Sequence, residues 1–154
     1  MEIRRDRRPR AAIRAAGIDA KEDPYGAPDQ RGPIDSLDQR RTQWFGIYVD
    51  DQLIGEVELT DIRRSEGCGE LRICIWREEL RGQGLGSDAV RVLLDYARMY
   101  LRLRLVYLRV YTTNTRAIRC YQQCGFVREG VLRPSARLPQ AVLLMRHELG
   151  MADA

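Results

Sequence analysis

The residues best suited to chemistry form a glycine-rich turn, Arg81-Gly82-Gln83-Gly84-Leu85-Gly86. A strand-like run precedes this turn and a helix-like run follows it. The N–H groups in the first turn of a helix have no partner within the helix, and the helix dipole is positive there. Glycine also lacks the Cβ that would hold a ligand away from the backbone. The arrangement predicts a binding site for a phosphate or pyrophosphate.

Glycine spacing separates the kinds of phosphate-binding loop. A Walker loop needs a lysine after its last glycine, and the single lysine, Lys21, lies far from the turn. A dinucleotide-binding turn reads GxGxxG, whereas this turn reads GxGxG and no acidic residue ends a second strand about 20 residues later. The pattern [Q/R]xxGx[G/A] fits Arg81, Gly84 and Gly86. A connector that binds no ligand remains an alternative for the hexapeptide alone.

A second group of candidate residues lies between Asn114 and Phe126, where the sequence reads NTRAIRCYQQCGF. Asn114 is suited to cap the helix that follows, and its amide could also contact a ligand near that helix start. Ala117, Tyr121 and Cys124 recur at helical spacing, so Tyr121 faces the interior or a cleft. Tyr121 is therefore either a packed ring or a proton donor in a cleft.

Together the two motifs resemble those of the GNAT N-acetyltransferase superfamily. The glycine turn is similar to its acetyl-CoA pyrophosphate loop, and the second segment is similar to its pattern NxxAIxxYxxxGF. The resemblance covers about residues 44–149 and implies an α/β fold. That fold is a mixed, mostly antiparallel sheet, splayed at its centre and flanked by helices.

The resemblance implies transfer of an acetyl group from acetyl-CoA to a primary amine by direct attack, without a metal. The residues implied to bind CoA are Ile73, Cys74, Ile75, Arg81, Gly82, Gln83, Gly84, Leu85, Gly86, Ser87 and Asn114. A backbone N–H around Ile73 to Ile75 is expected to stabilise the oxyanion. Tyr121 is the implied acid, because a phenol with a pKa of about 10 can protonate a nearby thiolate with a pKa of about 8.5.

The chemistry also needs a base or a chain of water molecules, because an ammonium group must lose a proton before it attacks. We select Glu70, which lies on the same strand as the expected oxyanion donor and could act through water. Glu56 and Glu58 on the preceding strand are rivals. Ion pairing of Glu70 with a nearby arginine, such as Arg72 or Arg109, is the alternative.

The single histidine and the four cysteines are interpreted as solvated or packing residues. His147 lies late in the last predicted strand. Cys120 and Cys124 are one helical turn apart, and Cys68 and Cys74 lie on a strand, but the CxxC pairs typical of zinc sites are absent. No histidine lies near Cys120 or Cys124 in the sequence to activate a nucleophile. We therefore expect four packing thiols and no metal site.

Hydrophobic periodicity supplies the elements that must position these residues. The predicted strands are residues 44–49, 52–62, 69–76, 105–111, 126–132 and 141–148, and the predicted helices are residues 87–101 and 115–123. An apolar stripe follows the glycine turn at Gly86, Val90, Leu93, Leu94, Ala97 and Leu101. We expect the first two strands to form a hairpin through Asp50-Asp51.

The length of 154 residues suits one domain, in which residues 44–150 form the acetyl-CoA-binding core. Residues 1–43 are expected to be a basic, poorly patterned segment with a short helix at 36–41 and no clean apolar first strand. The net charge of +4 is concentrated in residues 1–14. No aromatic residues interleave with these arginines, which favours a frayed tail over an RNA-binding arm.

Several classes of partner and location are disfavoured. The sequence contains no apolar run long enough to span a bilayer, and its cysteine usage suggests a reduced, cytoplasmic protein. The expected acceptor is a small-molecule amine or a protein N-terminus, nucleic acid is not favoured as a partner, and a homodimer is left open. The alternative function is a non-catalytic acyl-CoA-binding or RNA-tethered module on the same fold.

Overall fold

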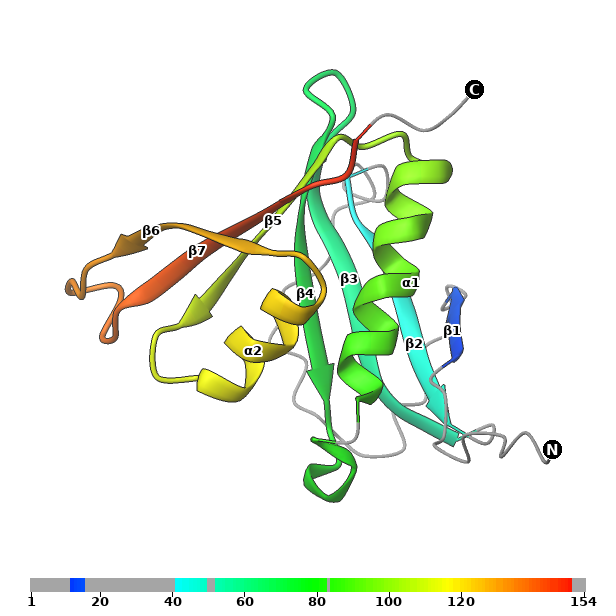
Figure 1. The fold of residues 1–154 in the computed structure, drawn as a ribbon, viewed down its shortest axis with the longest axis horizontal. Helices are drawn as coiled ribbons and strands as arrows, with labels where there is room; N and C mark the ends of the chain where they lie inside the picture. The colour runs from blue at the N-terminus through cyan, green and yellow to red at the C-terminus, as the bar shows by residue number, and fades with distance from the viewer. Residues whose placement is uncertain (1–11, 16–40, 50–51, 83, 151–154) are drawn as a thin grey trace, which may run out of the picture.

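The computed structural model describes residues 12–15, 41–49, 52–82 and 84–150, which form one sheet and two α-helices (Figure 1). The strands are β1 (Ala12–Ala15), β2 (Gln43–Val49), β3 (Gln52–Arg63), β4 (Cys68–Ile75), β5 (Leu105–Tyr111), β6 (Val127–Leu132) and β7 (Val142–Glu148). The helices are α1 (Leu85–Met99) and α2 (Thr115–Gln123), and a short 3-10 helix, η2 (Glu78–Leu80), follows β4. The strand order is β1-β2-β3-β4-β5-β7-β6.

The sheet opens between β4 and β5, the one parallel pair among its neighbouring strands. These two strands pair only where Cys68 to Glu70 face Leu105 to Tyr107. Beyond that point they diverge, and α2 lies beside the opening (Figure 1). The predicted sheet, mostly antiparallel and splayed at its centre, is confirmed.

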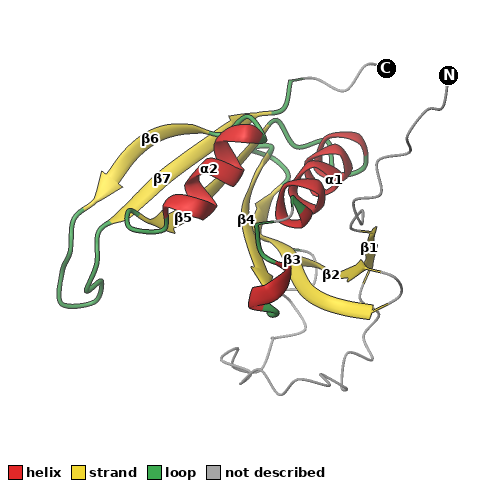
Figure 2. Cartoon of the chain, turned by 60° about the horizontal axis from the view of Figure 1, so that its bottom comes forward, coloured by secondary structure: helices red, strands yellow, loops and turns green. Residues whose placement is uncertain are grey.

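Both helices cover the same face of the sheet, α1 beside β3 and β4 and α2 beside β5 and β7 (Figure 2). The predicted apolar stripe is buried at Val90, Leu93, Leu94 and Ala97 of α1 and at Leu101, just beyond the end of the helix. Burying a leucine or valine side chain contributes about 1.5–3 kcal/mol, so this stripe fixes α1 against the sheet. Alternate residues of β5 are buried beneath the helices, which leaves the others on the opposite face.

Residues 1–43, where no clean apolar first strand was expected, contain the short strand β1. β1 pairs antiparallel with β2, with Ala12 opposite Tyr48 and Ala15 opposite Phe45. Four residues between arginines are too few to show the alternation of apolar and polar side chains that is typical of a strand. The strand is recognised only from its pairing with β2. The division into segments at residue 44 stays a prediction.

The remaining elements agree with the sequence-based assignment to within two residues at each end. The predicted helix at 36–41 lies outside the described residues except for Arg41, which is in a turn. Within the described part of the chain, neither α-helix is long and apolar enough to cross a membrane.

Candidate active site

The glycine turn has the backbone geometry of an anion site. Gly82 and Gly84 have φ angles of 77° and 83°, which residues with a Cβ rarely adopt. A Cβ at either position would meet no atom within 4 Å, so the space beside both backbones is open. Gly84 is the N-cap of α1 and supplies no side-chain hydrogen bond to its first turn. The N–H groups there are left to water or a ligand.

Arg81 joins this turn to the end of β4. Its Nε and Nη2 atoms donate to the carbonyl oxygen of Ile75 at 3.0 Å and 2.8 Å. These two bonds fix the turn relative to the strand. The guanidinium is thus engaged with the backbone, and the predicted contact of Arg81 with CoA is untested. Gln83 lies outside the described residues.

A pocket of about 400 Å³ lies in the splay between β4 and β5. It brings together four predicted site residues, Glu70 and Ile73 from β4 and Asn114 and Tyr121 from α2. The other predicted site residues, namely Cys74, Ile75, Arg81, Gly82, Gly84, Leu85, Gly86 and Ser87, are not among its lining residues. The predicted site therefore has two parts, a pocket in the splay and an open helix start beyond the end of β4.

Tyr121 lies on the inner face of α2 with 9% of its surface exposed. Its ring packs edge-on against Phe126, with ring centroids 5.9 Å apart. Burial raises the pKa of Tyr121, and no hydrogen bond to its hydroxyl is found among the described residues. The raised pKa keeps this hydroxyl protonated. Buried tyrosine hydroxyls usually have a hydrogen-bond partner, so this one is available to a ligand in the pocket.

Glu70 is buried and ion-paired with Arg109. The Nε of Arg109 donates to one carboxylate oxygen at 2.8 Å, and its Nη2 donates to the other at 3.4 Å. This hydrogen bonding raises the pKa of Arg109. The pairing considered as the alternative for Glu70 is therefore present in the structure. Any amine or water molecule that reaches Glu70 must share its oxygens with this guanidinium.

Asn114 fulfils the predicted capping role. Its Oδ1 accepts from the backbone N–H of Ala117 at 3.3 Å, and the residue also lines the pocket. His147 is outside the pocket and packs against the end of α2, where a Cβ on Gly125 would lie 3.0 Å from its ring. Burial lowers the pKa of His147. The interpretation of His147 as a packed residue agrees with this position.

The four cysteines are free thiols in unlike surroundings. Cys124 is buried, Cys68 and Cys120 are partly exposed, and Cys74 is exposed. The interpretation as a packing thiol is therefore wrong for Cys74, whose strand position places it on the face of the sheet opposite to α1 and α2. The described residues contain no group of three or more side chains suited to hold a metal.

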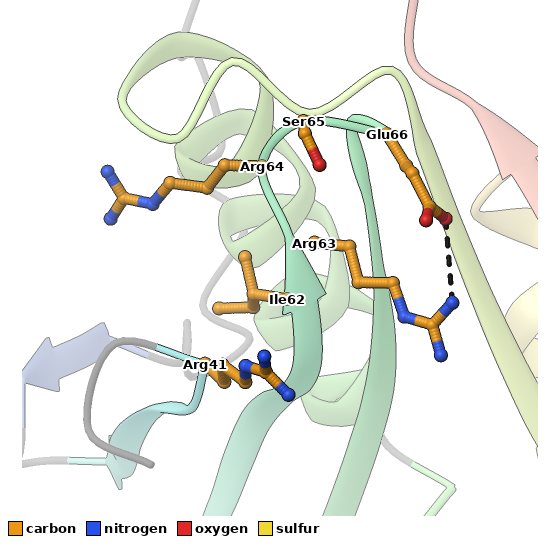
Figure 3. Close-up of a pocket in the computed structure, with 6 residues that line it drawn as sticks. All are labelled: Arg41, Ile62, Arg63, Arg64, Ser65 and Glu66. Carbon is orange, nitrogen blue, oxygen red and sulfur yellow. Dashed lines mark ion pairs between the residues drawn. The ribbon is translucent and has the colours of Figure 1, made fainter. Parts of the chain in front are cut away.

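A larger hollow of about 780 Å³ lies where β3 turns towards β4 (Figure 3). Its lining residues are Arg41, Ile62, Arg63, Arg64, Ser65 and Glu66. Figure 3 shows Arg63 directed towards Glu66, with which it forms an ion pair at 3.5 Å. None of the predicted site residues lines this hollow, so it is separate from the candidate active site.

Comparison with known proteins decides the family. The model of the acetyltransferase (GNAT) family matches residues 12–126. The chain belongs to this family. A probable N-acetyltransferase of Bacillus subtilis, YjcK, is 31% identical over 127 residues, which cover 76% of this chain and 68% of the relative. The GNAT match begins at the strand that sequence reasoning missed.

Other GNAT relatives resemble this chain over shorter stretches or in fold. Spermidine N(1)-acetyltransferase of Vibrio cholerae is 39% identical over 80 residues, which cover 52% of this chain and 46% of the relative. The chain thus spans about half the length of that relative. The structure of Vibrio cholerae spermidine N-acetyltransferase in complex with CoA and spermine has a TM-score of 0.74 at 25% identity and covers 90% of this chain and 95% of that one. The predicted superfamily and fold are confirmed.

Sequence reasoning missed much of the pocket wall. Tyr111 lines it from β5, together with Arg109, which the sequence suggested only as a partner of Glu70, and the alternation of that strand could have placed both on one face. Leu132, Leu138 and Val142 line it from the β6–β7 hairpin. No signal near these residues in the sequence connects them with the splay, because the contact depends on the strand order of the finished sheet.

Proposed function

We propose that this protein transfers an acetyl group from acetyl-CoA to a primary amine that attacks the thioester directly. The observation that carries the proposal is the buried Tyr121, whose hydroxyl has no partner among the described residues and which lines the pocket. The open start of α1 supplies a separate anion site, as a ligand with a pyrophosphate at one end and a thioester at the other requires.

The acetyl-CoA phosphates would bind the free N–H groups at the start of α1, from Leu85 to Ser87. The chain between the phosphates and the thioester contains amide groups. Beyond Glu70, the edge of β4 that faces β5 has no strand partner in the described part of the sheet. That edge offers hydrogen bonds to such amides. It would also place the thioester oxygen near an N–H around Ile73 to Ile75.

The proposed reaction removes two protons from the acceptor nitrogen and supplies one to sulfur. The ammonium gives its first proton to Glu70 through water, and the neutral amine forms a bond to the acetyl carbon. The carbon–sulfur bond then breaks, Tyr121 gives its proton to the departing thiolate, and the second proton of the nitrogen passes through water to restore Tyr121. The product is an amide, and free CoA leaves. Arg109 would hold the Glu70 carboxylate in place beside the pocket during these steps.

We further propose an aliphatic polyamine as the acceptor. Support comes from the spermidine acetyltransferases among the relatives. Carboxylates on the face of the sheet opposite to α1 and α2 offer a second argument. Glu56 lies opposite Cys74 and Glu58 opposite Arg72, so both share a face with Glu70. A cytoplasmic location and a homodimer remain predictions.

Thiol release from acetyl-CoA tests the proposal. Spermidine, a peptide with a free N-terminus and a buffer without amine would be compared, and the acetylated product identified by mass spectrometry. Fastest release with spermidine is expected. Faster release with the peptide would overturn the polyamine proposal but keep the reaction. Acetyl-CoA binding without release in any arm would overturn catalysis in favour of a binding module.

A further inference from the structure

Two thiols and a hydroxyl form a cluster where α2 packs against the start of α1. Cys120 and Cys124 are one turn apart on α2. The Sγ of Cys120 lies 3.2 Å from the Oγ of Ser87, in the first turn of α1. The thiol of Cys124 donates to the backbone carbonyl of Ser87 at 3.6 Å. The proposed acyl transfer uses neither cysteine.

The sulfur of Cys120 also lies against the backbone of the glycine turn. A Cβ on Gly86 would stand 3.7 Å from this sulfur, which is ordinary van der Waals contact. Cys120 is partly exposed, whereas Cys124 is buried. A small reagent can therefore reach Cys120 more readily than Cys124. Any group added to the Cys120 sulfur must find room beside the first turn of α1.

The surroundings of Cys120 favour its thiolate. A hydrogen bond with Cys124, the hydroxyl of Ser87 and the charge of Arg91 together lower the pKa of Cys120 to about 6, although burial opposes them. The positive end of the α1 dipole acts in the same direction. By contrast, partial desolvation raises the pKa of Cys68 and of Cys74.

We propose that Cys120 is a nucleophilic modification site that takes low-molecular-weight disulfides and controls the affinity of the adjacent α1 start for acetyl-CoA. The Cys120 thiolate attacks one sulfur of the disulfide, a new sulfur–sulfur bond forms, and the other half leaves as a thiolate that takes a proton from water. The Cys120 sulfur is oxidised and the leaving sulfur is reduced. A free thiol reverses the step. The effect on acetyl-CoA rests on the proposed function, whereas the reactivity does not.

The fraction of Cys120 present as thiolate determines how much faster it should react than an ordinary thiol. At about pH 5.5, a thiol with a pKa of about 6 is about one quarter thiolate, against about one thousandth for an ordinary thiol with a pKa of about 8.5. The lower basicity of the Cys120 thiolate also lowers its nucleophilicity. That loss leaves an advantage of about 10- to 20-fold.

The test treats the full chain with dipyridyl disulfide at that pH, follows release of the pyridine thiol, and maps the adduct by mass spectrometry. We expect the first adduct on Cys120, formed about 10-fold faster than on Cys74, and Cys120→Ser should remove this fast phase. Cys124→Ala keeps the nucleophile but removes its hydrogen-bonding partner, so the pH midpoint of the fast phase should rise. First reaction at Cys74, or an unchanged midpoint in Cys124→Ala, would overturn the site.

The acetyl-CoA affinity of the adduct tests whether modification of Cys120 controls binding at the start of α1. Calorimetry should show binding at least about 10-fold weaker after treatment of the wild type, and no change after treatment of Cys120→Ser. Unchanged binding by the wild-type adduct would overturn the control of affinity. If the untreated protein binds no acetyl-CoA while Cys120 still reacts first, the proposed function fails and the reactive site stands.

Discussion

The two helices border the candidate site, but their first turns differ. α1 begins at Gly84, which has a positive φ angle and supplies no side-chain cap. α2 begins at Asn114, whose side chain caps the N–H of Ala117. The first turn of α1 therefore has no side-chain acceptor for its N–H groups, whereas the first turn of α2 has one in Asn114. The open start suits binding of an external anion, and the closed start suits rigid support of a side chain further along the helix.

That side chain is Tyr121, and the half-buried Tyr107 shows what is unusual about it. The hydroxyl of Tyr107 donates to Asp61 at 2.8 Å, whereas that of Tyr121 has no partner among the described residues. Burial raises the pKa of both phenols. Tyr107 is half-buried and Tyr121 is buried, so the two differ in depth as well as in the hydrogen bonding of their hydroxyls.

The largest expected effect separates these two tyrosines. Tyr121→Phe should lower turnover by about 10²- to 10⁴-fold, the usual contribution of a positioned general acid, with little change in CoA affinity. Stability should change by no more than about 1 kcal/mol. Tyr107→Phe, the matched control, should lose about 1 kcal/mol of stability through its bond to Asp61 and keep turnover within about threefold. Equal turnover in the two variants would return Tyr121 to a packing role.

The second prediction separates binding at α1 from chemistry at α2. Gly84→Val should weaken CoA binding at least about 10-fold, equivalent to about 1.4 kcal/mol, because the side chain fills the open space beside the first turn. Gly150→Val is the control, since Gly150 has a φ angle of 70° and equally open surroundings. Both variants should lose stability from backbone strain. Calorimetry should find the affinity loss in Gly84→Val alone, and an equal loss in both would point to unfolding.

The same contrast explains which features of the site could be predicted from the sequence alone. Glycines at fixed spacing and an asparagine at a helix start are local signals, so the two helix starts could be predicted. The partner of Glu70 depends on which arginine the parallel pairing of β4 with β5 brings alongside, and the sequence offered both Arg72 and Arg109. The sulfur contacts of Cys120 depend on helix packing, which no local pattern reports.

The third prediction concerns the closed start of α2. Asn114→Ala should cost about 1 kcal/mol of stability, because the N–H of Ala117 loses its acceptor. Thr115→Ala, on the exposed first residue of the same helix, should stay within about 0.5 kcal/mol of wild type. Urea unfolding of both variants provides the measurement. A comparable cost in both would show that the Asn114 side chain contributes no cap.

The smallest expected effect lies at the other end of α2, where His147 packs beside Gly125 and Phe126. Burial lowers the pKa of His147 in the folded protein, so the unfolded chain binds the proton more readily. Stability from this residue is therefore complete above the unfolded pKa of about 6.5 and declines as the pH falls through it. His147→Gln should flatten that part of the profile of unfolding free energy against pH, measured by urea unfolding. Tyr121→Phe, in which His147 is intact, should keep the wild-type slope. A slope unchanged in His147→Gln would mean that protonation of this ring does not disturb the end of α2, and the pH dependence would have to come from other groups.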